Sequence, residues 1–391
     1  MRRGNYTLLP VLVALLSVTL LPQSAQAIPA FSKKYGYSCA SCHNAWPMLN
    51  AFGRRFKENG YQVERDQEMS DEANVKSDGL TLYKYTALSP RIKGYAFDKK
   101  KDKVTKIRPL HEVELMLAGN IGQKASYWVE LEGEDEDGWD IFVESGFVGL
   151  HPKDQFNGLL GYGPVFWSDP YQTLADGGRR LTASHMAFAD LGYATGQRMR
   201  SSTPQLTAYG RVAKRLFYST GVNTGSGDPE GGDDKKFMGR GAFDVNDNIM
   251  VGGYVWAGQT ILDEDSPSAD FSRAGLDFQL QYDTFSVFGN WMRASDDLID
   301  DPQGVSQDND AFSFTGLYTL MRNKRSIVVP IVRIESYELE GGDKSFTNGT
   351  FNVTFYPIEN WNVSLEFWAN LDTPSGVSKD HRTTLLFNAV F

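Results

Sequence analysis

Apolar and polar residues alternate along most of the chain from about residue 80 to the C-terminus. The clearest case is the segment 361–371, where the odd positions are apolar and Asn362, Ser364 and Glu366 lie between them. The same period of two recurs in the segments 251–257, 276–282 and 312–320. An alternation of this kind predicts β-strands that have one apolar and one polar face.

The polar face of these predicted strands is rich in carboxylates and amides. In the segment 112–117, three aliphatic residues alternate with Glu112, Glu114 and Met116. Aromatic residues gather towards the strand ends, as in the girdles of outer-membrane barrels. The C-terminal segment is a further alternating strand that ends on an aromatic residue, which is typical of such barrels: Thr383, Leu385, Phe387, Ala389 and Phe391.

These features favour a transmembrane antiparallel β-barrel over the alternative, a water-soluble β-sandwich. A spanning strand takes about 10 residues, and its turns and loops take about as many again. Residues 76–391 therefore predict about 16 strands, with 14 or 18 also compatible. Tight turns are expected at 245–248 and 359–360. Longer, extracellular loops are expected at three places: 224–236, 263–270 and 296–309.

The N-terminal residues form a predicted secretory signal peptide. Arg2 and Arg3 precede an apolar stretch at 8–21, and the small residues Ala25 and Ala27 suit a signal peptidase that cleaves after residue 27. A membrane anchor is the alternative, but the stretch is shorter than the ~20 residues of a spanning helix. The signal predicts export, and the barrel predicts a bacterial outer membrane.

A short helical segment follows, within residues 28–75. Leu49, Phe52 and Phe56 recur at helical spacing and predict one apolar face, and Gly60 is positioned to end the helix as its C-cap. The predicted domains are thus a signal peptide at 1–27, a small helical segment at 28–75 and a barrel at 76–391.

Charge and cysteine content narrow the range of functions. The chain has 39 Lys and Arg residues against 49 Asp and Glu residues, a formal net charge of -10. This balance argues against nucleic-acid binding and is compatible with attracting cations. Two cysteines in a secreted chain of this length do not make a disulfide scaffold. No Ser/His/Asp arrangement, phosphate loop or paired-carboxylate motif indicates a hydrolase.

Both cysteines lie in one motif, Cys39-Ala40-Ser41-Cys42-His43. C-x-x-C-H is the attachment sequence of a c-type haem. Two thiols three residues apart reach the two vinyl groups on one edge of the porphyrin, and the next imidazole falls under the iron as proximal ligand. The sequence therefore predicts one covalently bound c-type haem held by Cys39, Cys42 and His43.

Three other interpretations of this motif are a redox-active cysteine pair, half of a zinc site, and chance. A redox pair usually opens a helix after a strand, and no βαβ pattern surrounds this motif. Zinc needs further ligands close by, and the chain has no other cysteine.

The sixth iron ligand is left open by the sequence. Met48 is the nearest soft donor, but a loop of five residues from His43 reaches the opposite face of a haem with difficulty. Met69, His111 and His151 are more distant alternatives, and an open sixth position is another. A methionine ligand would raise the reduction potential relative to a second histidine.

Residues after the motif are candidates for the haem surroundings. Trp46 and Pro47 are candidates for walling the porphyrin edge. Arg54, Arg55 and Lys57 either pair the haem propionates or form the solvated face of the helix. Because the segment precedes the first strand and a barrel of this size encloses a wide lumen, we expect it to plug that lumen.

The run 28–43 and its continuation 47–61 resemble the N-terminus of outer-membrane cytochrome–porin fusions, of which the iron oxidases of iron-oxidising bacteria are the best known. The resemblance implies that Cys39 and Cys42 hold the haem and that His43 ligates it. It also implies a barrel that exposes the haem to an extracellular donor and hands electrons to periplasmic carriers.

The function expected from these observations is an outer-membrane electron conduit that takes electrons from an extracellular donor, Fe(II) above all. As an enzyme it would be an oxidoreductase of the iron:cytochrome c type. The partners are then the extracellular donor, a periplasmic c-type cytochrome or other electron carrier, and outer-membrane lipid. The alternatives are outward electron export to an extracellular acceptor, and a porin or sensor barrel whose haem is structural or binds a ligand.

Overall fold

The computed structural model describes these parts of the 391-residue chain: 30–63, 74–77, 80–83, 88–121, 124–174, 191–225, 235–260, 268–298, 305–323 and 325–391. The predicted signal peptide at 1–27 and the ligand candidate Met69 lie outside these residues. Among the described residues, no helix is both long and apolar enough to cross a membrane.

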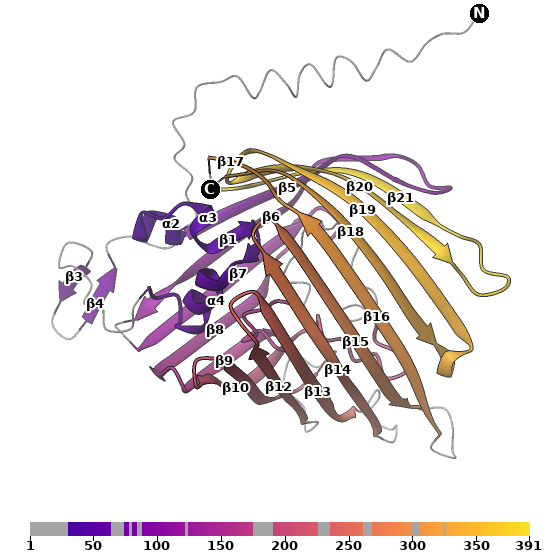
Figure 1. Cartoon of the computed structure of the whole chain (residues 1–391), viewed down its shortest axis with the longest axis horizontal. Coiled ribbons are helices and arrows are strands. Elements are labelled where there is room, and N and C mark those ends of the chain that lie inside the picture. Colours follow the sequence, from indigo (N-terminus) through magenta and orange to yellow (C-terminus); the bar gives the residue numbers. More distant parts are fainter. Residues whose placement is uncertain are drawn as a thin grey trace, which may run out of the picture.

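Most described residues belong to one closed antiparallel barrel (Figure 1). Its strand segments are β5 (Leu88–Lys100), β6 (Lys106–Ile121), β7 (Ala125–Glu134), β8 (Ile141–Lys153), β9 (Phe156–Pro164), β10 (Ser202–Val212), β11 (Leu216–Asn223), β12 (Lys236–Asp244), β13 (Ile249–Thr260), β14 (Ala269–Tyr282), β15 (Phe285–Asp297), β16 (Ser306–Tyr318), β17 (Leu320–Arg322), β18 (Arg325–Leu339), β19 (Lys344–Ile358), β20 (Trp361–Asp372) and β21 (His381–Val390).

Each strand pairs with its neighbours in sequence, and β21 closes the barrel by pairing with β5 through Phe387↔Gly94 and adjacent residues. The three-residue β17 continues β16, because both pair with β18. The described residues therefore form a sixteen-stranded barrel, which confirms the predicted fold class and strand number and excludes the sandwich.

The two faces of the barrel are the inverse of those in a water-soluble protein. Leu276 on β14 and Leu365 on β20 point outwards and are 61% and 54% exposed. Their neighbours Asp277 and Glu366 point into the lumen and are buried. An apolar outer face with a polar interior is the arrangement that a lipid bilayer requires, because the outer surface of such a barrel contacts lipid and not water.

The two ends of the barrel differ in the length of their connections. Turns of a few residues join the strands at one end, including the predicted turns at 245–248 and 359–360. Longer connections lie at the other end, including those between β11 and β12, β13 and β14, and β15 and β16, where loops were predicted. In barrels of this type the short turns face the periplasm and the longer loops face outside.

The connection between β9 and β10 is the longest of the barrel, and the parts of it that the structure describes, called the inward loop below, lie in the lumen. Its described parts are 165–174 and 191–201, and both bond to the inner face of the barrel. Tyr171 donates to Asp244 on β12 (2.7 Å), and Thr173 donates to Asp277 on β14 (2.5 Å).

Residues 30–63, called the plug below, lie within the barrel at the short-turn end. The plug contains α2 (Ala30–Tyr35), α3 (Cys39–Cys42), β1 (His43–Ala45), β2 (Met48–Leu49) and α4 (Ala51–Glu58). Figure 1 shows α2, α3 and β1 at the same end of the barrel as the C-terminus. A separate hairpin of β3 (Asn74–Ser77) and β4 (Leu80–Tyr83) follows, and a 3-10 turn, η3 (Glu340–Gly342), lies between β18 and β19.

Hydrogen bonds from several directions fix the plug to the inner face of the barrel. Arg54 donates to Gln279 (3.0 Å) and Gln281 (2.7 Å) on β14, and Lys34 donates to Asn120 (2.7 Å) on β6. These contacts reach strands well separated around the barrel, so the segment fills part of the lumen as predicted.

Candidate functional site

A cavity of about 350 Å³ lies between the plug and one side of the barrel, and it is called the plug cavity below. Cys39, Cys42 and His43 all line it, so the fold brings the whole predicted attachment motif to one wall. The facing residues come from β5 to β8 and from the inward loop between β9 and β10. Its volume lies in the range of cofactor sites, and its lining is mainly apolar.

Helix α4 holds the cysteine segment in place through Asn50. The Asn50 side chain caps α4 by accepting from the backbone NH of Gly53 (2.9 Å), and its amide donates to the carbonyl of Ser41 (3.0 Å). The Asn50 backbone NH also donates to the Cys42 carbonyl (2.9 Å). One residue therefore starts the helix and orients the chain between the two cysteines.

Gly53 permits the closest approach between α4 and α3. A Cβ at this position would overlap the carbonyl oxygen of Cys42 and press on the Leu49 side chain. Only glycine fits between the two helices at this contact.

The end of α4 is a Schellman motif: the C-cap is Asn59, and the predicted Gly60 lies one position later, in the left-handed conformation that ends the helix. The Tyr61 backbone NH donates to the Phe56 carbonyl (2.9 Å), and the Gly60 NH donates to the Lys57 carbonyl (3.1 Å). Gly60 has φ of 68° and its Cα faces the ring of His151, so a side chain there would be both strained and overlapping. The cap turns Tyr61 back towards the plug cavity, which it lines.

His43 is oriented by a hydrogen bond between its Nδ1 and the carbonyl oxygen of Pro47 (3.0 Å). A carbonyl only accepts, so Nδ1 carries the proton and the lone pair of the imidazole is on Nε2. Metal-ligating histidines are commonly held by such a bond from their other ring nitrogen, which fixes the tautomer and the ring orientation.

The two cysteine thiols are not joined by a disulfide. Burial raises the pKa of Cys39 to about 12, helped by the nearby Glu359 carboxylate, and burial raises the pKa of Cys42 to about 11. A redox-active pair instead needs a lowered thiol pKa. Among the described residues, neither cysteine belongs to a group of three or more potential metal ligands, so the zinc interpretation has no ligand set there.

Aromatic rings form much of the cavity wall. Phe31 packs against Phe56 and Tyr61, with centroids 5.0 and 5.1 Å apart, and Tyr61 contacts Trp128 of β7 at 5.8 Å. The predicted Trp46 and Pro47 also line the cavity. Flat apolar rings on several sides suit a large planar ligand.

The structure separates the other candidate residues named from the sequence. Met48 packs among apolar residues of β16, β18 and β19 and is not part of the cavity lining. His151 is buried between Ser126 (2.7 Å) and Tyr209 (3.2 Å), also outside this lining.

Of the three basic residues of α4, Lys57 reaches the plug cavity, whereas Arg54 and Arg55 bond to the barrel elsewhere. The Lys57 ammonium donates to the Asp169 carbonyl (3.1 Å) and lies 5.2 Å from the ring centroid of Trp167. Burial lowers the pKa of Lys57 to about 8, so it is still mostly cationic at neutral pH.

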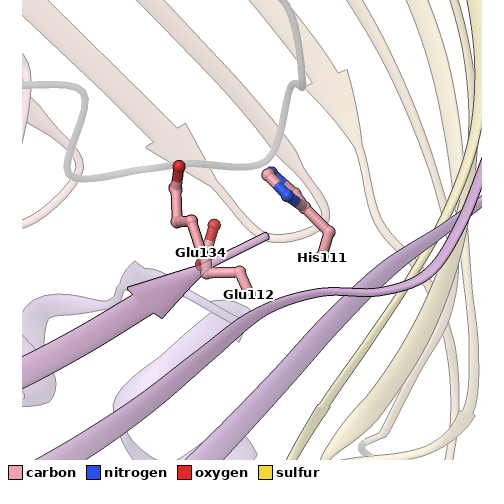
Figure 2. A group of neighbouring side chains, drawn as sticks. All are labelled: His111, Glu112 and Glu134. Atoms are coloured by element: carbon pink, nitrogen blue, oxygen red, sulfur yellow. The ribbon is translucent and has the colours of Figure 1, made fainter. Parts of the chain in front are cut away.

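His111 lies farther along β6, towards the long-loop end, in a group of carboxylates. His111, Glu112 and Glu134 have ligand atoms within 4.8 Å of one another, as do Glu112, Glu114 and Glu132. Figure 2 shows His111, Glu112 and Glu134 on neighbouring strands of the barrel. The imidazole Nδ1 of His111 also lies 2.9 Å from an Asp135 carboxylate oxygen.

Sequence reasoning missed the residues that the barrel and the inward loop contribute to the cavity. Met116 and Trp128 are lumen-facing positions of β6 and β7, and Trp167 comes from the inward loop. Alternation marks the first two as lumen-facing, but nothing in the sequence says which part of the lumen the plug reaches.

The sequence matches no protein-family model and no curated protein. The fold is similar to that of solved outer-membrane barrels. An anion-selective porin from Comamonas acidovorans aligns with a TM-score of 0.62 and 11% identity, over 78% of this chain and 99% of the porin. Salmonella typhi OmpF, solved with daunomycin, aligns with a TM-score of 0.59 and 12% identity, over 81% of this chain and 100% of OmpF.

A loop-deletion mutant of OmpT, an outer-membrane protein of Vibrio cholerae, aligns with a TM-score of 0.58 and 12% identity, over 78% of this chain and 99% of OmpT. At these identities the likeness concerns the fold. The chain therefore has the porin-type barrel fold, with a plug that carries a C-x-x-C-H motif in its lumen.

Proposed function

We propose that this protein is an outer-membrane electron conduit, in which a single c-type haem attached to Cys39 and Cys42 lies in the plug cavity. It takes electrons from an extracellular donor, Fe(II) above all, and passes them to a periplasmic carrier. The observation that carries the proposal is the meeting of Cys39, Cys42 and His43 on one wall of a mainly apolar lumen cavity. This is also the function implied by the resemblance of residues 28–61 to cytochrome–porin fusions.

The residues of the cavity fit a c-type haem in their chemistry. Two protonated thiols at the required spacing are available for thioether bonds, and the Nδ1–Pro47 bond holds the His43 ring with its lone pair on Nε2. Aromatic and aliphatic side chains exclude water from a planar macrocycle, and Lys57 offers a cation to a propionate. When bound, a haem supplies one-electron chemistry: the donor leaves as Fe(III) and the electron passes on to the carrier.

The position of the cavity within the barrel supports a conduit rather than a cytochrome of one compartment. The apolar band of an outer-membrane barrel is ~25 Å thick and insulating. A redox group inside the lumen near the short turns is close to the periplasm, and the long loops at the other end of the barrel face outside. A donor that enters from outside and an acceptor that docks from the periplasm then meet the same group.

The lumen face of β6 and β7 favours a cationic donor. In the strand register Glu112 lies opposite Glu134 and Glu114 opposite Glu132, followed by Met116 opposite Glu130 at the cavity. Carboxylates therefore line one side of the lumen from the long-loop end down to the plug cavity. Arg91 and Lys93 of β5 neutralise part of this charge, because they pair with Glu112, and Arg91 also pairs with Glu114. A remaining negative field would concentrate Fe(II) near the cavity.

The proposal is tested first on the mature protein purified from outer membranes. We expect a haem stain that survives denaturing electrophoresis, and its loss in the Cys42→Ser variant. Met321→Ser is the matched control, because this exposed β17 residue is not part of the cavity lining. A colourless mature protein would exclude a haem function of any kind.

Stopped-flow mixing with Fe(II) tests the donor and the direction. We expect the oxidised protein to be reduced, and to pass the electron to a soluble c-type cytochrome inside vesicles. If the haem stays oxidised in excess Fe(II) across pH and its midpoint potential lies well below that of the Fe(III)/Fe(II) couple, outward export replaces iron oxidation.

A further inference from the structure

We infer that the thioether sulfur of Met116, on barrel strand β6, is the sixth ligand of the haem iron. This inference rests on the proposed function and goes beyond it, because it makes the haem site a joint product of plug and barrel. The observation behind it is that His43 from the plug and Met116 from the barrel line the same cavity.

The strand register directs Met116 into the lumen at the cavity. On β6 the lumen-facing positions are Glu112, Glu114, Met116, Ala118 and Asn120, alternating with aliphatic residues on the lipid side. The row is polar except at Met116 and Ala118, and these two residues line the plug cavity. The thioether of Met116 therefore lies at the boundary between the polar part of the lumen face and the apolar plug cavity.

Met116 differs from the other methionines that the structure describes. Five of them are buried in apolar clusters and one is exposed: Met48, Met199, Met238, Met250, Met292 and, on the surface, Met321. Met116 is half-buried, belongs to none of these clusters, and lines the cavity. The apolar clusters of the barrel therefore do not include this side chain, whereas a ligand in the cavity would contact it.

Three other polar groups around the cavity already have hydrogen-bond partners. The Lys57 ammonium bonds to the Asp169 carbonyl, and the Tyr35 hydroxyl donates to the Tyr61 carbonyl (2.9 Å). The Glu130 carboxylate accepts from Ser145 (3.0 Å). A soft thioether is also the donor that iron porphyrins with a histidine on the other face commonly take.

The ligand has consequences for the protein. A methionine on the second face raises the reduction potential relative to a second histidine, which suits acceptance of electrons from Fe(II). Because Met116 belongs to the barrel, six-coordination also requires the plug to be seated against β6. Haem ligation then reports on the docking of the plug.

The test compares Met116→Leu with Met48→Leu in the full-length protein, both being volume-conserving substitutions. We expect wild type and Met48→Leu to show the sulfur-to-ferric-iron charge-transfer band and slow CO binding in the ferrous state. Met116→Leu should keep its covalent haem but lose the band, bind CO rapidly, and show a lower midpoint potential. Met116→His should restore six-coordination without the band.

Heat-modifiable migration on gels checks that each variant still forms a closed barrel. The inference is overturned if Met116→Leu keeps the band, if Met48→Leu loses it, or if wild type carries covalent haem without it. These outcomes leave the proposed function standing, because the haem is present. Absence of covalent haem from wild type overturns the proposed function, and this inference with it.

Discussion

Gly53 shows how a single residue controls the geometry of the candidate site. It lies in α4, where alanine would normally favour the helix by about 1 kcal/mol. Yet a Cβ there would overlap the Cys42 carbonyl, and relieving such overpacking costs about 1–3 kcal/mol. The steric cost of a Cβ exceeds the gain in helix propensity. The close approach of the helices therefore explains why this residue is glycine.

We therefore predict that Gly53→Ala lowers the yield of haem-loaded protein, because α4 must move away from the cysteine segment. The ratio of covalent haem to protein after expression is the measurement. Gly316→Ala is the matched control, since a Cβ at this β16 position meets nothing within 4 Å. Equal haem content in the two variants would contradict the role given to Gly53.

At the scale of elements, the pairing of β6 with β7 places a row of lumen-facing carboxylates next to the plug cavity. The register stacks Glu112 with Glu134 and Glu114 with Glu132 before it reaches Met116. Sequence alternation identifies which side chains face inwards, but only the pairing register aligns the carboxylates of one strand with those of the next.

We predict that the double variant Glu132→Gln/Glu134→Gln is reduced by Fe(II) about tenfold more slowly at low salt, because the field that attracts cations is weaker. The difference should shrink at high ionic strength, where charges are screened. Reduction by an uncharged donor and the haem spectrum should not change.

Glu340→Gln is the control for this prediction, because its carboxylate lies in the η3 turn at the long-loop end and its side chain is 53% exposed. Stopped-flow rates over a range of salt concentrations provide the measurement. If Glu340→Gln slowed the reduction by Fe(II) as much as the Glu132→Gln/Glu134→Gln double variant does, the result would argue against the entry of Fe(II) along β7.

At the scale of the whole molecule, the outer surface of the barrel is suited to contact with lipid and not with water. Exposed apolar residues such as Leu276 surround the barrel, whereas buried Arg–carboxylate pairs such as Arg240–Asp277 (2.8 Å) fill its interior. Such a surface is stable only against lipid, so stability should depend on how deep a charge is placed in the bilayer.

We predict that Leu276→Arg, near the middle of β14, lowers the free energy of unfolding in lipid vesicles by about 2–4 kcal/mol. Val245→Arg, in the short turn between β12 and β13, should cost about 0–1 kcal/mol, because the turn lies at the membrane interface. Denaturant titration followed by tryptophan fluorescence measures both. Equal costs would mean that the apolar outer surface does not face a bilayer.

The sequence alone determined the barrel class and the strand number, and it contains the C-x-x-C-H spacing from which the haem is predicted, because each depends on local spacing. A period of two gives the face of most strand residues, except where a register shift interrupts the pairing, and the spacing of Cys39, Cys42 and His43 is set within five positions. The end of α4 at Gly60 is equally local and was predicted correctly, although the C-cap itself is Asn59. Chain length divided by strand length gave the strand number, since a membrane of fixed thickness sets both.

Only the tertiary structure decided what surrounds the motif. Met48 is close to His43 in sequence, but the turn between β1 and β2 directs it into the barrel's apolar packing. Met116 is more than seventy positions away, and strand pairing together with the depth of the plug brings it to the cavity. Sequence spacing reports geometry within one element, whereas contacts between the plug and the barrel depend on how the sheet closes.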